Sequence, residues 1–188
     1  MPMTMRHDAL AAAAASVVAI EREGCGAPVH GVSTVGRFES GPGAFNVVPD
    51  EARVWAEMRS TEGEWLTGAR RRVVDAIGAE ASQRGVDLVV EWLNDQEPVR
   101  ADPLVQDVIG TAADSLGLTW QAIPSGAGHD AAHLAHLGPM GMIFVPSIGG
   151  RSHCPEELSE TRDIAEGIHV LAATLAQMDA RPDPVGSA

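Results

Sequence analysis

The chain has 188 residues, a formal net charge of −13 and 45% hydrophobic residues. This length suffices for one domain or two small ones with a buried core. The negative charge argues against nucleic acid and anionic membranes as partners, because both select for basic surfaces. The sequence shows no apolar run of about 18 residues and no signal-peptide pattern, so we expect no transmembrane helix and a cytoplasmic location. Cys25 and Cys154 are too few for a disulfide framework.

The first half of the chain predicts a helix, two strands, a second helix and a third strand. Apolar residues at helical spacing mark the helices, and short alternating runs mark the strands. The expected elements are a helix over residues 4–23, strands over 32–38 and 53–58, a helix capped by Thr61 and closed by Gly85, and a strand over 86–93. The polar segment that follows, residues 94–103, carries two prolines and is expected to link two domains.

The second half predicts three helices and two short strands. Asp102 and Pro103 are typical of a helix N-cap and first turn. A short strand over residues 120–123 should lead into a loop, a short helix, a buried strand and another loop. The last helix is expected over residues 161–178, with four side chains facing inward: Ile164, Ile168, Leu171 and Leu175. The polar tail, residues 180–188, is expected to be disordered.

Residues 124–157 contain four of the seven histidines and two glycine-rich turns. In α/β proteins such loops sit at strand ends, where ligands commonly bind. Three segments carry a family resemblance: GRFESGPGAFNVVPDEARVWAEMRS at 36–60, SGAGHDA at 125–131 and FVPSIGGRSHCPEE at 144–157. They resemble the carbamoylase/hydantoinase branch of the zinc aminoacylase-type metallopeptidase superfamily, with its N-carbamoyl-L-amino-acid hydrolases, allantoate amidohydrolases and β-ureidopropionases.

The resemblance covers nearly the whole chain but only the C-terminal part of such an enzyme, less than half of it. It implies an α/β (α+β) fold with two parts. Residues 1–95 would form a ferredoxin-like lid or dimerisation domain that lacks its first strand, and residues 96–188 a C-terminal segment of the catalytic domain. Without that strand, two others would keep unpaired edges. We therefore expect another chain to supply the strand, as a homo-oligomer or a separately encoded N-terminal half-enzyme, unless the sheet pairs in a new way.

The resemblance implies that His153 is the family's C-terminal metal ligand, with Gly150 shaping the loop that presents it. The alternative is an ordinary surface histidine. A catalytic metal commonly has three protein ligands, so one histidine does not hold it. We expect zinc or manganese in the completed enzyme and no metal tightly bound by this chain alone. Glu156 and Glu157 either support the metal ligand or form an acidic approach to the last helix.

The resemblance also implies a substrate site. His129 would contact the substrate and stabilise an oxyanion, and Gly128 would let the backbone approach the ligand. Alternatively, this stretch is a helix N-terminus capped by Asp130. Asn46 and Arg59 would hold the carboxylate and amide of a small substrate, since an arginine fork pairs well with a carboxylate. The alternative is that Asn46 is an ordinary turn residue and that Arg59 is a solvent-exposed charge at a strand end.

Three functional readings remain open at this stage. In the first, the chain is a subunit of a split amidohydrolase that cleaves a C–N bond of an N-carbamoyl or N-acyl amino acid or a ureido acid. In the second, it is an inactive binding or dimerisation module. In the third, it is a truncated fragment of such an enzyme. The general base and most metal ligands would lie outside this sequence. By itself the chain should be catalytically incomplete.

Overall fold

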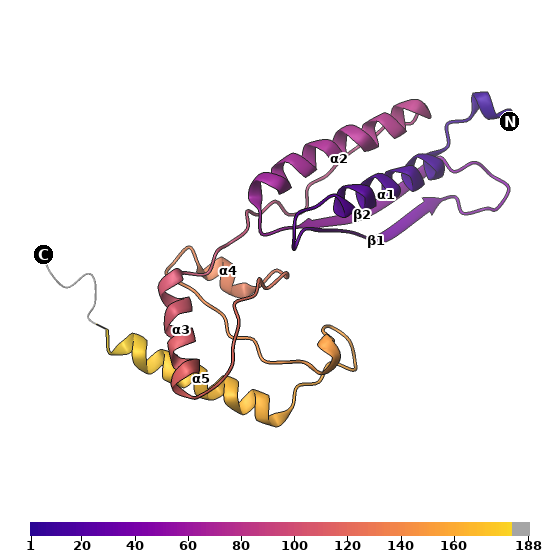
Figure 1. Ribbon diagram of the computed structural model, residues 1–188. Helices are drawn as coiled ribbons and strands as arrows, with labels where there is room; N and C mark the ends of the chain where they lie inside the picture. The colour runs from indigo at the N-terminus through magenta and orange to yellow at the C-terminus, as the bar shows by residue number, and fades with distance from the viewer. Residues whose placement is uncertain (182–188) are drawn as a thin grey trace, which may run out of the picture. The chain divides into compact units, whose positions relative to one another are not determined.

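The computed structural model describes residues 1–181, which form two units (Figure 1). The first comprises Met1–Pro98 together with Pro124–Ala127, and the second comprises Val99–Ile123 together with residues 128–181. Both contain helices, and the first also contains a small sheet, so the predicted α/β class is confirmed. Most of the tail predicted as disordered, residues 182–188, lies outside the described residues.

The first unit follows the predicted order of helix, strand, strand and helix. Its elements are η1 (Met3–Met5), α1 (Ala9–Cys25), β1 (Val32–Gly41), β2 (Glu51–Arg59) and α2 (Gly63–Gln83). Helix α1 begins five residues later than predicted, because the Asp8 carboxylate caps it by accepting from the Ala11 amide at 2.9 Å. The predicted Thr61 cap is wrong. Glu62 occupies the N-cap position of α2 and makes no side-chain cap bond.

Strands β1 and β2 form an antiparallel hairpin that runs from Val32 opposite Arg59 to Gly41 opposite Glu51. Helix α1 packs against one face, where the Ser33 hydroxyl donates to the Ile20 carbonyl at 2.8 Å. Because side chains alternate along a strand, the charged residues gather on the other face. They pair there as Arg37 with Glu39, Arg53 with Glu51, and Arg59 with Glu57. This second face also carries Trp55, whose ring lies 4.4 Å from the Arg37 guanidinium.

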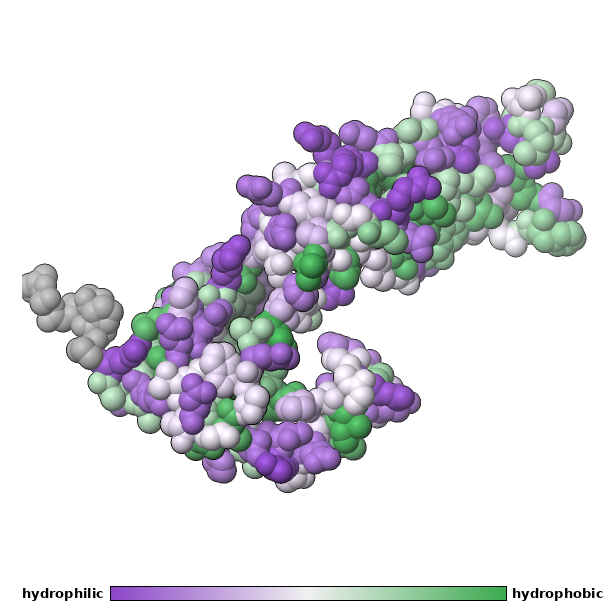
Figure 2. All heavy atoms as spheres, in the orientation of Figure 1, coloured by the Kyte–Doolittle hydropathy of each residue, from purple (hydrophilic) through white to green (hydrophobic). Residues whose placement is uncertain are grey.

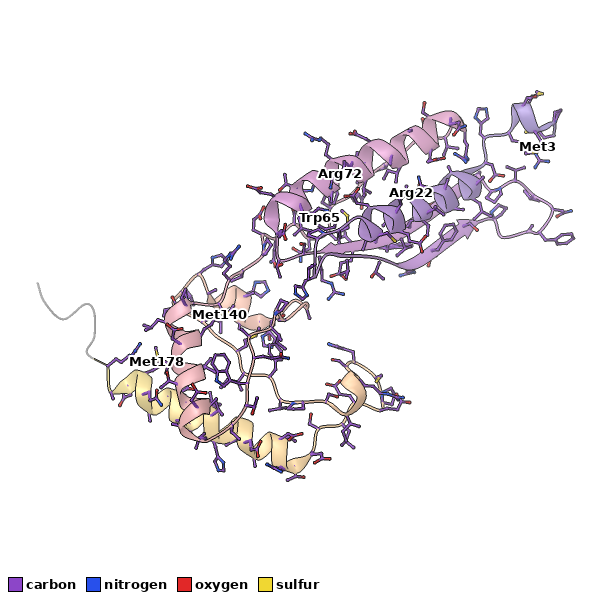
Figure 3. The ribbon with its side chains drawn as sticks, viewed as in Figure 1. Met3, Arg22, Trp65, Arg72, Met140 and Met178 are labelled. Carbon is purple, nitrogen blue, oxygen red and sulfur yellow. The ribbon has the colours of Figure 1, made fainter. Side chains whose placement is uncertain are left out.

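Helices α1 and α2 pack together through small and β-branched residues. Ala69 and Val73 of α2 are buried, and Ile20 of α1 is buried as well. Arg72 of α2, labelled in Figure 3, spans the contact and donates from Nη2 to Glu23 Oε1 at 2.5 Å. The hydrogen bond to Glu23 raises the pKa of the Arg72 guanidinium above its ordinary value.

The strand predicted over residues 86–93 is not formed. After Gly85, which has a φ of +63°, the chain turns back along α2. Leu88 lies beside Gly78, the Trp92 ring lies 4.5 Å from the Arg70 guanidinium, and Glu97 reaches Gly63. The segment therefore spans α2 from end to end in an extended path. A strand needs a hydrogen-bonded neighbour, and the described residues provide none here.

The second unit contains α3 (Pro103–Ser115), α4 (Asp130–Leu134), η2 (Ile148–Gly150) and α5 (Thr161–Asp179). The predicted start of α3 is confirmed. The Asp102 carboxylate accepts from the Leu104 amide at 2.8 Å and the Val105 amide at 3.2 Å. The Asp102 amide in turn donates to the carbonyl of Met140, labelled in Figure 3. The start of α3 is therefore tied to the chain that follows α4.

The small core of this unit lies between α3 and α5. Ala112, Ala113 and Val170 are buried there, with Ile143 packed against them. The predicted inward face of α5 is wrong: its four large apolar residues, Ile164, Ile168, Leu171 and Leu175, are all exposed. The reason is that the small residues of α3 meet the Val170 side of α5, so the larger stripe is left uncovered. Figure 2 shows hydrophobic residues at the surface of both units.

The two strands predicted in the second unit are also not formed within the described residues. The segments concerned contact the helices through side chains instead. The Trp120 indole lies against Gly110 and donates to Asp114 Oδ1 at 2.9 Å, and Val145 lies against Gly167 of α5. As in the first unit, the described chain offers these segments no strand to pair with. Among the described helices, none combines the length and apolarity that crossing a membrane requires.

Candidate functional site

Asn46 and Arg59 belong to the first unit but lie at opposite ends of its hairpin. Asn46 is exposed in the loop that joins β1 to β2, and Arg59 is the last residue of β2. Strand β2, whose nine residues end with Arg59, runs between them, and it spans roughly 25 Å of extended chain. The structure therefore does not bring these two residues together in one chain.

The Arg59 guanidinium is held by two groups of the first unit. Its Nη1 donates to the Gly126 carbonyl at 2.8 Å, and its Nε lies 3.0 Å from Glu57 Oε1. The Nε atom is buried and out of line for a hydrogen bond, so the contact with Glu57 is an ion pair only. Glu57 and Gly126 thus orient a half-buried cation at the end of β2.

His129 occupies the N-cap position of α4. Its Nδ1 accepts from the Ala131 amide at 3.3 Å, so the predicted alternative of an Asp130 cap is wrong. An Nδ1 that accepts a hydrogen bond places the proton of a neutral imidazole on Nε2. The exposed ring can therefore offer an Nε2–H donor, the group that stabilises negative charge on a substrate oxygen. Gly128, which precedes it, has open space where a Cβ would lie.

His153 lies in a closed loop between residues 147 and 158. The Ile148 amide donates to the Leu158 carbonyl at 2.8 Å, and the Ser147 hydroxyl donates to the Arg151 carbonyl at 2.6 Å. Gly149 and Gly150 have φ values of +68° and +65°, which suit glycine. His153 has a φ of +56°, a left-handed conformation that costs a non-glycine residue about 1–2 kcal/mol.

Within the described residues, the side chains around His153 do not form a metal-binding cluster. No group of three or more histidine, cysteine, aspartate or glutamate side chains converges there. One imidazole falls short of the three protein ligands that a catalytic zinc usually has. The described residues thus do not by themselves fit a divalent metal centre.

The sequence and the fold match one family over most of their length. The model of the peptidase family M20/M25/M40 matches residues 7–177. The chain belongs to this family. It is 36% identical over 178 residues to an N-carbamoyl-L-amino-acid amidohydrolase of Paenarthrobacter aurescens, covering 95% of this chain and 43% of that protein. It is 34% identical to a ureidoglycolate hydrolase of Arabidopsis thaliana, covering 94% of this chain and 37% of that protein.

Solved structures of this family superpose on the chain. AtUAH in complex with (S)-hydroxyglycine matches with a TM-score of 0.89 and 33% identity, covering 96% of this chain and 43% of that one. A hydantoinase/carbamoylase family amidase from Burkholderia vietnamiensis matches with a TM-score of 0.90 and 31% identity, covering 97% and 44%. The chain thus spans less than half the length of the relatives it matches, and the resemblance read from the sequence is confirmed.

Three contacts at the candidate site were not predicted from the sequence: the bond from Arg59 to Gly126, the cap formed by His129, and the bond from the His153 amide to the Glu157 carboxylate. The first joins residues 67 positions apart, and sequence spacing carries no signal for it. The other two are local. A histidine two residues before an amide donor, and a glutamate four residues after a loop histidine, are patterns that a systematic search for side-chain to backbone bonds could find.

Proposed function

We propose that this chain forms the lid and the C-terminal segment of a metal-dependent amidohydrolase. The substrate would be an N-carbamoyl or N-acyl amino acid or a ureido acid, cleaved at a C–N bond. The observation that carries the proposal is the match of nearly the whole chain to N-carbamoyl-L-amino-acid amidohydrolases and ureidoglycolate hydrolases. In this proposal Arg59 binds the substrate carboxylate, the His129 Nε2–H stabilises the oxyanion, and His153 is one metal ligand.

The remaining ligands and the general base would come from a separately encoded chain equivalent to the N-terminal part of the relatives. The two-stranded sheet of the first unit supports a partner of this kind. Isolated two-stranded sheets are marginal in water, and each strand of this one has one unpaired edge. The extended residues 86–97 also lie along α2 without a strand beside them. An added strand would satisfy backbone groups in both places.

A second copy of the chain would complete the substrate site. One small amino-acid derivative is far shorter than the hairpin, so it cannot contact both Asn46 and Arg59 of the same chain. Asn46 would therefore act on a substrate held by Arg59 only from another copy. Symmetric dimers are the commonest soluble assemblies, and this geometry favours one.

The test is complementation with a relative. The chain is mixed with the part of the P. aurescens enzyme that precedes the matched region, in the presence of zinc or manganese. Ammonia release is measured from N-carbamoyl-L-amino acids, allantoate and ureidoglycolate. We expect hydrolysis of at least one substrate only when both portions are present, and its loss in Arg59→Ala and His153→Ala. A stable complex that binds a substrate without turning it over would contradict the proposal and indicate a binding module.

A further inference from the structure

The left-handed conformation of His153 has an identifiable support in the side chain of Glu157. Glu157 Oε2 accepts a hydrogen bond from the His153 backbone amide at 2.7 Å. The Glu157 amide donates in turn to the Cys154 carbonyl at 3.0 Å. Residue 157 therefore closes the turn 153–157 twice, once through its side chain and once through its backbone. The turn is fixed relative to the rest of the loop by the contacts of Ser147.

We propose that Glu157 is a positioning residue that holds His153 in its left-handed conformation and so sets the direction in which the imidazole leaves the loop. Histidine enters this backbone region more often than most non-glycine residues but still at a steric cost, and a charge-assisted hydrogen bond to its amide offsets part of that cost. That the imidazole is being presented to a reaction centre rests on the proposed function. The support that Glu157 gives to the backbone conformation of His153 is independent of the proposed function.

Glu156 provides a matched comparison. It is the adjacent carboxylate, it is exposed like Glu157, and its nearest cation is Arg151 at 3.8 Å. At that distance it makes no hydrogen bond, and it makes none to the His153 amide. Removing Glu156 deletes the same charge from the same loop while leaving the bond to His153 intact.

The experiment follows the His153 amide by 1H–15N NMR in the full chain. Its hydrogen-exchange rate reports the hydrogen bond, and its HN–Hα coupling reports φ. Glu157→Ala should speed exchange at His153 by about tenfold, the loss expected for one charge-assisted bond. Glu157→Gln, which keeps a neutral acceptor oxygen, should fall between Glu157→Ala and the unaltered chain. Glu156→Ala should match the unaltered chain.

His153→Gly supplies a second, independent readout. Glycine adopts this backbone region freely, so Glu157→Ala should destabilise the loop less in the glycine background than in the histidine background. Unchanged exchange and coupling at His153 in Glu157→Ala would overturn the inference. Equal effects of Glu156→Ala and Glu157→Ala would overturn it too.

The proposed function is scored separately by the complementation assay. If the unaltered chain gives no hydrolysis in that assay, the NMR measurements still test whether Glu157 supports the His153 backbone. If hydrolysis occurs and Glu157→Ala leaves the His153 amide unchanged, this inference fails while the proposed function survives. In the completed enzyme, partial recovery of activity in Glu157→Gln relative to Glu157→Ala would separate positioning from a general requirement for negative charge.

Discussion

Asp102 shows how one side chain can define the start of an element. Its carboxylate accepts from two amides of the first turn of α3, and Pro103 supplies the fixed φ that suits the first helical position. Both features are visible in the sequence, because capping depends on neighbours within three residues. Local partners do not guarantee a correct prediction, however, since the predicted caps Thr61 of α2 and Asp130 of α4 are both wrong.

Replacement of Asp102 by alanine should lower the free energy of unfolding by about 1 kcal/mol, the usual cost of losing an N-cap. Urea unfolding followed by circular dichroism measures it. Asp107→Ala is the control, since Asp107 is an exposed acid within the same helix. A loss as large in Asp107→Ala would show that charge, and not capping, produces the effect.

His129 and Arg59 show where residue-level prediction stops. The sequence identified both as site candidates through the family resemblance, and that resemblance is confirmed at family level. It did not reveal that Gly126 accepts from Arg59, because that bond depends on how distant segments fold together. The predicted strands did place Asn46 in the connection between them and Arg59 at the end of the second strand, and the structure agrees. Their roles in binding substrate stay predictions.

At the scale of elements, helices were predicted better than strands. A helix satisfies its own backbone, so periodicity and caps largely determine it. A strand is completed only by a neighbour, and three predicted strands have none in the described residues. The inward face of α5 was mispredicted for a related reason. That helix has two apolar sides, and its periodicity does not say which one meets α3.

Helix α5 allows a paired test of this packing. Val170 is 6% exposed, and its neighbour Leu171 is 49% exposed. Val170→Ala should lower the free energy of unfolding by about 1.5 kcal/mol, the value of two buried carbons. Leu171→Ala should change it by less than about 0.5 kcal/mol, as for surface sites. A larger loss for Leu171→Ala than for Val170→Ala would mean that the exposed stripe is covered in solution.

The unpaired segment over residues 86–93 gives a prediction about backbone protection. Its amides should exchange with solvent quickly in the chain alone, since no ladder protects them. Addition of the N-terminal portion of a relative should slow them, together with the amides on the free edge of β2. The buried α2 residues Ala69 and Val73 act as internal controls that should be protected throughout. Fast exchange at 86–93 in a formed complex would rule out strand addition there.

At the scale of the whole molecule, the distribution of ligands predicts metal content. We expect the chain purified alone, after dialysis against trace zinc and manganese, to retain far less than one metal ion. The described residues offer one candidate ligand, His153, and no cluster of three. Elemental analysis by mass spectrometry measures the ratio. About two tightly bound ions per chain would mean that the four histidines of residues 124–157, His129, His133, His136 and His153, form a centre of their own with nearby carboxylates.

The opposite placement of Asn46 and Arg59 predicts how variants combine. In the completed enzyme, Asn46→Ala and Arg59→Ala should each be inactive. A one-to-one mixture of the two variants should recover about a quarter of the unaltered activity, because half of the dimers are mixed and one of the two sites in each mixed dimer regains both residues. Each variant alone, taken through the same mixing procedure, is the control. No recovery in verified mixed dimers would place both residues in the site of a single chain.

The first unit is not a continuous stretch of sequence, and this affects the order in which the chain can be finished during synthesis. Its last members, Pro124–Ala127, follow Pro98 by roughly thirty residues, and they include the carbonyl that holds Arg59. At about 5–20 residues per second, a ribosome needs a further 1.5–6 seconds to deliver them. The hairpin and its helices can therefore assemble while Arg59 still lacks this partner. The Arg59 side chain at the end of β2 gains its hydrogen bond only after Gly126 has been synthesised.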